Sequence, residues 1–329
     1  YGVRPIEEPY FQKLNKYHYD LKLTSEFLNH DNAKLAQGMD AVLLRGNCVA
    51  DAENLKKFAD YGIKYVFTRT VGYDHYDLKA AKDLGIMVSR VPNYSPYAVA
   101  ELAFTLGMSL FRHVAESTVN THSGNFVMSP FFFSNEIHNA TVGIYGAGKI
   151  GATEGKLYHS LGTRVLAYDP YPSKYAEHFV EFVSSDELLA KSDIVSVHVP
   201  YFPGKNENLI NAEFMSKMKK SAIIINTARG ELSDTAAIAA AIESNQIEAY
   251  GADVTISESQ IMGHKFQSID EIPDPNVKSL MKLYPRVLIT PHMGSFTQPA
   301  LTDMISISFD NFNEALKTGT NKNIVTYQN

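Results

Sequence analysis

Three short stretches in the second half of the chain each carry one side chain of a type that often does chemistry. They are "NTARGEL" from Asn226, "GADVTISES" from Gly251 and "TPHMGS" from Thr290, and they contribute Arg229, Glu258 and His292. A histidine transfers protons near neutral pH, and an arginine binds a carboxylate through two parallel hydrogen bonds. A carboxylate next to an imidazole orients the ring and raises its pKa. The three stretches lie at or near the ends of predicted strands, which is where open α/β sheets bind ligands.

Each of these side chains also has an ordinary structural alternative. Arg229 could form a surface ion pair, Glu258 could be a solvated loop acid, and His292 could be a hydrogen-bonded loop histidine. We interpret other histidines as structural, namely His75, His113, His122 and His138. No cluster of His, Cys, Asp and Glu has the spacing of metal ligands, so we predict no metal site.

A glycine-rich loop follows a predicted strand in the stretch "VGIYGAGKIGATEGKLYHSLGTRVLAYDP", from Val142 to Pro170. Gly146, Gly148 and Gly151 fit the pattern G-x-G-x-x-G, a helical stretch follows, and Asp169 ends the next predicted strand. In that context the pattern is typical of dinucleotide binding. Gly146 would allow a tight turn, Gly148 would let a pyrophosphate approach the backbone, and Gly151 would let the helix pack on the sheet.

The acidic residue at the end of the second strand indicates which dinucleotide binds. Asp169 can accept hydrogen bonds from the ribose hydroxyls of the adenosine half, whereas a 2′-phosphate would meet a like charge. The helix N-terminus and its free N–H groups would hold the phosphates. We therefore predict NAD as the cofactor in preference to NADP. A tight strand-to-helix turn without a ligand is the alternative.

The elements that would position these residues alternate between strand and helix along the chain. Short apolar stretches predict strands at 41–45, 65–69 and 87–90, and a second series at 141–145, 164–168, 194–199, 222–226, 249–254 and 287–290. A long helix is predicted to start at Pro96. This alternation favours an α/β fold with two Rossmann-like, doubly wound parallel-sheet domains.

The predicted division places a substrate domain at 1–95, an NAD-binding domain at 96–292, and a return to the substrate domain at 293–329. The substrate domain would then be discontinuous, because the last helix folds back onto it. The opening "YGVRP" is expected to lie inside a first strand, with a few leading residues missing.

Composition limits the classes of partner. The 329 residues have a net charge of −6 and no basic cluster, so we expect no nucleic-acid binding. No apolar run is long enough to cross a bilayer and no signal peptide is recognisable, so we expect no membrane association. The single cysteine, Cys48, is typical of a reducing compartment, and we expect a cytoplasmic protein.

Together, the glycine loop and the three stretches resemble the NAD-dependent D-2-hydroxyacid dehydrogenase family. The chain looks most similar to the branch of D-lactate, D-2-hydroxyisocaproate and (R)-2-hydroxyglutarate dehydrogenases. The stretches "RVPNYSPYAVAELAFTLGM" and "VLAYDPYP" also resemble this branch. The resemblance covers nearly the whole chain, and the ordered combination of motifs is more specific than any one of them.

The resemblance implies roles for individual residues. Arg229, Glu258 and His292 match the family's catalytic arginine, glutamate and histidine. Val71, Gly72 and Tyr94 match its contacts to the substrate carboxylate. Further cofactor contacts are implied for Lys149, Ile150, Val199, Pro200, Asn206, Thr227, Ala228 and Asp253. Many relatives have different residues around the glutamate, where this chain reads Thr255-Ile-Ser-Glu-Ser259.

A D-2-hydroxyacid dehydrogenase that reduces pyruvate and other 2-oxo acids with NADH is therefore the leading expectation. One alternative is an (R)-2-hydroxyglutarate dehydrogenase, in which Arg45 would bind the distal carboxylate of the substrate. Arg45 could instead pair with a nearby acid. A further alternative is a non-enzymatic NAD-binding corepressor. We also expect a homodimer, because the long helix from Pro96 and the phenylalanine-rich loop after it would suit an interface.

Overall fold

The computed structural model describes residues 1–327 and divides the chain into two compact units. Unit 1 comprises residues 1–95 and 296–329, and unit 2 comprises residues 96–295. The second division falls after Ser295, three residues later than expected. The physical reason is local: the backbone N–H groups of Met293 and Gly294 donate to Asp253, which keeps this turn within unit 2.

Unit 2 is built on a seven-stranded sheet with the strand order β10-β9-β8-β7-β4-β5-β6. All neighbouring strands are parallel. The strands are β4 (Thr141–Tyr145), β5 (Arg164–Tyr168), β6 (Glu181–Phe182), β7 (Ile194–Val197), β8 (Ile223–Asn226), β9 (Ala249–Ala252) and β10 (Val287–Ile289). The chain goes from β4 to β5 and β6 on one side and then returns to β7 on the other. The sheet therefore has a topological switch point between β4 and β7, the place where such sheets bind ligands.

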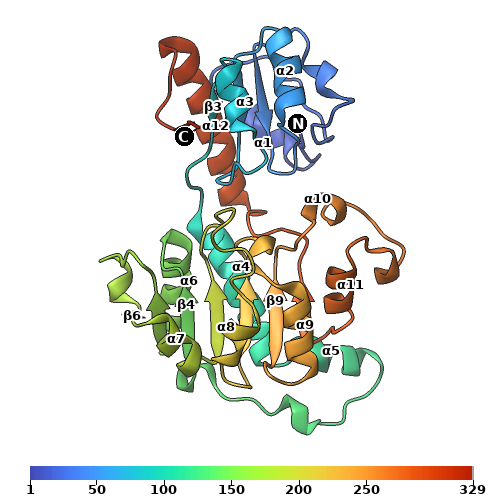
Figure 1. The fold of residues 1–329 in the computed structure, drawn as a ribbon, viewed down its shortest axis with the longest axis vertical. Coiled ribbons are helices and arrows are strands. Elements are labelled where there is room, and N and C mark those ends of the chain that lie inside the picture. Colours follow the sequence, from blue (N-terminus) through green and yellow to red (C-terminus); the bar gives the residue numbers. More distant parts are fainter. Residues whose placement is uncertain (328–329) are drawn as a thin grey trace. The chain divides into compact units, whose positions relative to one another are not determined.

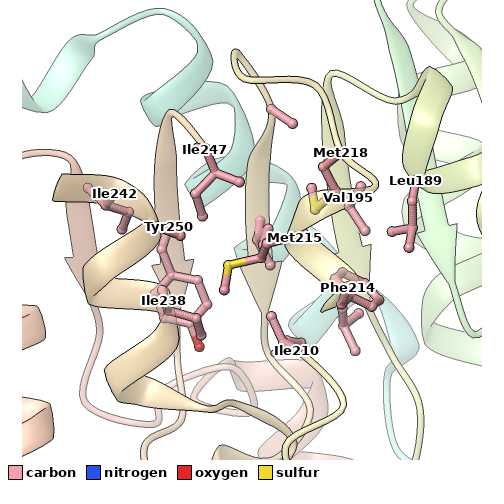
Figure 2. Packing of buried hydrophobic residues seen from close by; sticks show 14 of the residues in the cluster. Leu189, Val195, Ile210, Phe214, Met215, Met218, Ile238, Ile242, Ile247 and Tyr250 are labelled. Carbon is pink, nitrogen blue, oxygen red and sulfur yellow. The ribbon is translucent and has the colours of Figure 1, made fainter. Parts of the chain in front are cut away.

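Helices cover both faces of this sheet (Figure 1). One face packs against α4 (Pro96–Phe111) and α6 (Lys149–Ser160). The other face packs against α7 (Ser185–Lys191), α8 (Ala212–Ser216), α9 (Thr235–Glu243) and α11 (Pro275–Met281). Figure 2 shows this second core, in which Met215 and Ile238 lie over Val195 and Tyr250 of the sheet. The remaining elements are α5 (Val114–His122), α10 (Glu258–Ile261) and the 3-10 turns 130–132, 137–139, 176–178, 230–232 and 269–271.

Unit 1 contains two small sheets. In the first, β1 (Ala41–Leu44) pairs in parallel with β2 (Tyr65–Thr68). In the second, β3 (Val88–Ser89) pairs antiparallel with β11 (Ile324–Val325). The helices are α1 (Glu8–Leu14), α2 (Ala52–Asp60), α3 (Leu78–Asp83) and α12 (Gln298–Thr318), with a 3-10 turn at 33–36. Aspartates cap α2 and α3, since Asp51 and Asp77 accept backbone hydrogen bonds from the first turns.

The last helix, α12, belongs to unit 1. Ile305 and Phe309 of α12 pack with Phe11 of α1 in one core cluster. Phe312 of α12 stacks on Phe67 of β2 with ring centroids 4.5 Å apart. These contacts make unit 1 discontinuous in sequence.

The structure also differs from the sequence predictions in three places. The short strand β6 was not predicted, because two residues carry no periodicity. The predicted strand at 87–90 is shorter and pairs antiparallel with β11. The expected first strand is not formed, although the N–H groups of Gly2 and Val3 donate to the carbonyls of Glu26 and Thr24. Within residues 1–327, no helix has the length and apolar character needed to cross a membrane.

Candidate active site

The glycine loop lies at the switch point between β4 and β7. Gly146 has a φ of +101°, and a Cβ there would lie 2.9 Å from the carbonyl carbon of His198. A Cβ on Gly151 would collide with the carbonyl oxygen of Gly146. Both positions therefore require glycine, one for its conformation and the other for the close approach of α6 to the loop.

The same loop fits the phosphates of a dinucleotide. A Cβ on Gly148 would meet no protein atom within 4 Å, so the space beside this residue is open. Gly148 is the N-cap of α6, and no side chain caps the helix there. Lys149 and Ile150 form its first turn, where backbone N–H groups and the helix dipole attract an anion.

Asp169 directly follows β5 and lies next to the glycine loop. Its carboxylate accepts hydrogen bonds from the backbone N–H of Ala147, at 2.9 Å, and of Tyr171, at 2.8 Å. The Asp169 side chain therefore stabilises the glycine loop through Ala147 and the turn after β5 through Tyr171. That its remaining lone pairs bind ribose hydroxyls stays a prediction.

The other residues assigned to the cofactor lie at the carboxyl ends of β7, β8 and β9. Val199 and Pro200 follow β7, and the Asn206 side chain closes their loop by donating to the Pro200 carbonyl at 2.8 Å. Thr227 and Ala228 follow β8, and the buried Thr227 hydroxyl has no hydrogen-bond partner within residues 1–327. All of these positions belong to the edge of the sheet that carries the glycine loop.

Arg229 belongs to a loop that two features hold against the sheet. The Asn226 amide donates to the Arg229 carbonyl at 2.8 Å, and its oxygen accepts from the Ala228 N–H at 2.9 Å. A Cβ on Gly230 would collide with the peptide of Thr255, so glycine allows this loop to touch the segment after β9. The guanidinium itself donates to the Ala228 carbonyl at 2.7 Å.

Asp253 anchors the loop that carries His292. Its buried carboxylate accepts from the N–H groups of Met293 and Gly294, at 2.8 and 2.7 Å, and from the Thr290 hydroxyl. Burial raises the pKa of this carboxyl, and the three hydrogen bonds oppose that rise. The geometry makes Asp253 a positioning residue for the histidine loop, and the contact with the cofactor that the resemblance implies stays a prediction.

The structure brings Glu258 and His292 together. Nδ1 of His292 and Oε2 of Glu258 are 2.9 Å apart, and both side chains are partly exposed. His292 has a φ of +52°, and Ser257, just before the glutamate, has a φ of +59°. Both backbones are in the left-handed region, which non-glycine residues seldom adopt and which recurs at functional sites.

The environment of His292 favours its protonated form. Burial lowers the pKa of the imidazole, but the hydrogen bond and the charge of Glu258 outweigh it, and the net pKa is raised. The charge of Asp253 adds to this effect and that of Arg229 opposes it. Among residues 1–327, no protein group hydrogen-bonds Nε2 of His292, so this nitrogen can exchange a proton with a ligand.

The predicted carboxylate contacts of unit 1 follow β2 and β3. The carbonyl of Val71 accepts from Arg90 at 3.1 Å, and that of Gly72 accepts from Thr70 at 2.7 Å. Their own N–H groups donate to nothing else in the described part of the chain. Tyr94 lies half-buried just before the division between the units.

Arg45 belongs to a group of three arginines around a single buried acid. Arg45 and Arg69 directly follow the paired strands β1 and β2. Glu7 pairs with Arg69 at 2.8 Å and with Arg4 at 3.4 Å. Arg45 forms no ion pair in residues 1–327, although the charge of Glu7 acts on its guanidinium. Both the contact with substrate and the pairing with a nearby acid stay predictions. Burial and the two neighbouring arginines lower the pKa of its guanidinium to about 10.

Sequence reasoning missed three residues that shape this site. Asn226 and Gly230 hold the loop of Arg229 in place. Both residues stand in the stretch "NTARGEL", close to the arginine, and could have been singled out there. His198 forms a buried pair with Glu154 of α6, and its carbonyl carbon lies against Gly146. No local sequence pattern predicts the pair of His198 and Glu154, because the two residues are 44 positions apart. Within residues 1–327, no group of acidic, histidine or cysteine side chains could hold a metal ion.

Comparisons with known proteins agree with this geometry. The family model "D-isomer specific 2-hydroxyacid dehydrogenase, NAD binding domain" matches residues 104–294, more than half of the chain. A D-lactate dehydrogenase of Lactiplantibacillus plantarum is 34% identical, and the match covers 97% of this chain and 96% of that protein. An aromatic 2-oxoacid reductase of Clostridium sporogenes is 33% identical, over 98% and 97% of the two chains.

Solved structures show the same likeness. The NAD⁺-bound D-lactate dehydrogenase of Lactobacillus jensenii superposes with a TM-score of 0.85 and is 35% identical. The match covers 100% of this chain and 98% of that one. The glycine loop fits the dinucleotide that this family binds, so NAD is the cofactor. The chain belongs to the D-isomer-specific 2-hydroxyacid dehydrogenases, a family of NAD-dependent oxidoreductases.

Proposed function

We propose that this enzyme reduces small 2-oxo acids to D-2-hydroxy acids with NADH, and that pyruvate is its principal substrate. The observation that supports the proposal most is the bond between His292 Nδ1 and Glu258 Oε2, which leaves Nε2 for a ligand. A relative of this chain is named a D-lactate dehydrogenase. Pyruvate needs one anion site, and the guanidinium of Arg229 is a group of the kind that binds a carboxylate.

In this mechanism the protein binds, orients and protonates the substrate. Arg229 holds the carboxylate through two hydrogen bonds and polarises the neighbouring carbonyl. His292 donates a proton from Nε2 to the carbonyl oxygen, and Glu258 keeps the ring in place and stabilises its charged form. When bound, NADH supplies the hydride that reduces the carbonyl carbon. In the reverse reaction, His292 accepts the proton of the hydroxyl group.

A second candidate substrate is 2-oxoglutarate, the five-carbon diacid. It is favoured by a local surplus of positive charge, because Arg4, Arg45 and Arg69 lie around the carboxylate of Glu7. Arg45 is the arginine of this group without an ion pair in the described residues. A distal carboxylate would neutralise it, and pyruvate has no such group.

Comparing 2-oxo acids as substrates tests both proposals. NADH oxidation is followed with pyruvate, a branched 2-oxo acid and 2-oxoglutarate, and kcat/KM is compared among the three. The reverse reaction is measured with both enantiomers of each hydroxy acid. We expect activity with pyruvate and with the D enantiomers only. Activity with the L enantiomers would contradict the proposed stereochemistry, and NADH binding without turnover on any of them would favour the corepressor alternative.

The preference for NADH is predicted to depend on the charge of Asp169. Asp169→Asn keeps an oxygen that can accept from Ala147 but removes the charge that repels a 2′-phosphate. We expect the ratio of kcat/KM for NADH to that for NADPH to fall by about tenfold or more. Asp186→Asn, at an exposed position of the same unit, should leave the ratio unchanged. Equal efficiency of the wild type with both cofactors would contradict the prediction.

The pH profile is predicted to depend on Glu258. Reduction requires a protonated His292, so its rate declines as pH rises through the pKa of the imidazole. Glu258 raises that pKa, and Glu258→Gln should therefore shift the alkaline limb of kcat to lower pH. Glu243→Gln, an exposed residue of unit 2, serves as the control. An unchanged profile in Glu258→Gln would mean that another group stabilises the imidazolium.

A homodimer is the assembly that we propose. The segment around η2 (Pro130–Phe132) exposes Phe126, Val127, Met128 and Phe133 at 80%, 74%, 82% and 92% of their surface. Helix α5, just before it, buries no residue of its own. An apolar patch of this kind commonly marks a protein interface. The Phe126→Glu/Phe133→Glu variant should sediment as a monomer, while Tyr171→Glu, at another exposed aromatic residue, should not. A monomeric wild type at micromolar concentration would contradict the proposal.

The cytoplasm is the compartment that we propose. Cys48 is the single cysteine of the chain and is buried, and few cysteines without disulfides are common in reducing compartments. Cell fractionation with an antibody against the protein tests this assignment, and recovery from the secreted fraction would contradict it.

A further inference from the structure

Glu258 follows a backbone turn that needs an outside contact to keep its conformation. Ser257 has φ and ψ of +59° and +30°, in the left-handed region that residues with a side chain seldom adopt. Glu258 then begins α10, a helix of four residues. A single helical turn is not stable alone, because its first hydrogen bond fixes several residues at once. The direction of the Glu258 side chain therefore depends on what holds Ser257.

The side chain of Asp274 holds Ser257. The Ser257 hydroxyl donates a hydrogen bond to Oδ2 of Asp274 at 2.9 Å. The other carboxylate oxygen, Oδ1, accepts from the backbone N–H groups of Asn276 and Val277 at 2.9 and 3.1 Å, and so caps helix α11. One carboxylate thus joins the start of α11 to the residue before Glu258.

Helix α11 is a fixed support for this contact. Its side chains Val277 and Leu280 are buried, and Leu280 belongs to the core cluster that packs on the sheet together with α9 (Figure 1). Ser257 and Asp274 are 17 positions apart. Between them, residues 263–271 are exposed apart from the half-buried Phe266, so this stretch offers little packing that could orient the glutamate. The bond to Asp274 therefore ties the turn at Ser257 to the core of unit 2.

The residue that Ser257 directs is the one that binds the imidazole. Oε2 of Glu258 lies 2.9 Å from Nδ1 of His292. Two other charged groups act on this ring, since Asp253 raises the pKa of His292 and Arg229 lowers it. Asp253 is held by its own hydrogen bonds within the histidine loop. A change at Ser257 would therefore reach His292 mainly through Glu258.

We propose that Ser257 and Asp274 are positioning residues for this pair, and that their hydrogen bond holds the left-handed turn that aims Glu258 at His292. Without the bond, the turn relaxes towards commoner backbone conformations and the carboxylate spends less time at Nδ1. The positive charge of the imidazolium is then less stabilised. This inference rests on the proposed role of His292 as the proton donor. It adds two residues that the resemblance to the family does not imply.

Substituting each partner separately tests the proposal. Ser257→Ala removes the hydroxyl and leaves the cap of α11 intact. Asp274→Asn is the conservative variant, because asparagine also caps helices and its amide can donate to the Ser257 hydroxyl. Ser279→Ala, at an exposed serine of the same helix, is the control. Glu258→Gln and the double variant Ser257→Ala/Glu258→Gln complete the set.

Two properties of His292 are then compared in the full-length enzyme. The pKa of its imidazole is measured by NMR of isotope-labelled histidine, and His292→Ala identifies the resonance. The kcat for pyruvate reduction is measured as a function of pH. Thermal unfolding of every variant gives Tm, which reports any loss of stability separately.

Ser257→Ala should lower the pKa of His292, by less than Glu258→Gln does, and should move the alkaline limb of kcat to lower pH. Above this pKa, kcat should fall by about threefold or more, while at the acid end it should change by less than about twofold. The double variant should match Glu258→Gln, because the hydroxyl acts only through the glutamate. Ser279→Ala should keep the wild-type profile, and Asp274→Asn should lie closer to the wild type than Ser257→Ala does.

The possible results separate this inference from the proposed reaction. A lower Tm of Ser257→Ala with an unchanged pKa of His292 would overturn the inference, because the bond would then serve only the stability of the fold. Additive effects of the two substitutions in the double variant would overturn it as well. If Ser257→Ala and Glu258→Gln lower the pKa of His292 but leave the pH profile of kcat unchanged, the positioning of Glu258 stands and the proposed proton transfer fails.

Discussion

His292→Ala is expected to lower kcat for 2-oxo acid reduction by a factor on the order of 10² to 10⁴, the usual contribution of general acid catalysis. The variant loses the group whose Nε2 has no other protein partner in the described residues and whose Nδ1 is bound by Glu258. The site of the dinucleotide is built from other residues, so the dissociation constant of NADH should change little. Single-turnover kinetics and NADH fluorescence measure the two quantities separately.

A matched control excludes a general effect of removing an imidazole from unit 2. His264 is exposed on the same unit and touches neither Glu258 nor Asp253. His264→Ala should retain full kcat and an unchanged circular dichroism spectrum. If His292→Ala keeps its kcat within about threefold, this histidine is not the proton donor, and the proposed mechanism fails even if the enzyme remains a reductase.

Arg45→Ala separates the two candidate substrates. If Arg45 binds a distal carboxylate, the substitution should cost about 2 to 5 kcal/mol of transition-state binding with 2-oxoglutarate, the range for breaking a buried charge pair, and kcat/KM should fall accordingly. That range corresponds to roughly thirty-fold to several-thousand-fold. Pyruvate and a branched 2-oxo acid should be affected little, because neither has a second carboxylate. We expect this effect because three guanidinium groups, those of Arg4, Arg45 and Arg69, share one carboxylate, that of Glu7.

Two further variants make the Arg45 result interpretable. Arg45→Lys keeps the charge and should retain part of the activity with 2-oxoglutarate, although a lysine lacks the two-pronged geometry of arginine. Arg164→Ala breaks only the exposed ion pair with Glu181 in unit 2 and should leave kcat/KM unchanged for all three substrates. Equal losses with all three 2-oxo acids in Arg45→Ala would mean that Arg45 supports the fold of unit 1 rather than a distal carboxylate.

The dinucleotide site is the part that could best be predicted from the sequence. Gly146, Gly148 and Gly151 act over six positions, within one strand-to-helix turn, so the constraints on them are local. Asp169 ends the next strand, which pairs directly with the first, and a parallel register places it beside the loop. In the same way, apolar stretches with β-branched residues predicted the central strands of the sheet. A strand that is buried on both faces is a continuous apolar run, which can be recognised in the local sequence.

The pairing of Glu258 with His292 could be predicted only in part. The residue types of Glu258 and His292 were recognisable, but their contact spans 34 positions. It depends on two left-handed backbones, at Ser257 and His292, which no periodicity reveals. Asp253 shows the limit most clearly. The resemblance implies a contact between Asp253 and the cofactor, but only the fold shows that its carboxylate also holds the turn after β10.

By itself, the sequence determined the α/β class, the glycine loop with its NAD cofactor and the choice of Arg229, Glu258 and His292 as candidate catalytic residues, because each depends on residue type and short spacing. The tertiary structure alone decided that Glu258 reaches His292, that Asp253 anchors the loop of His292, and that Arg45 lies beside Arg4, Arg69 and Glu7. These features depend on which distant segments pack together, and packing is set by the whole chain rather than by any local pattern.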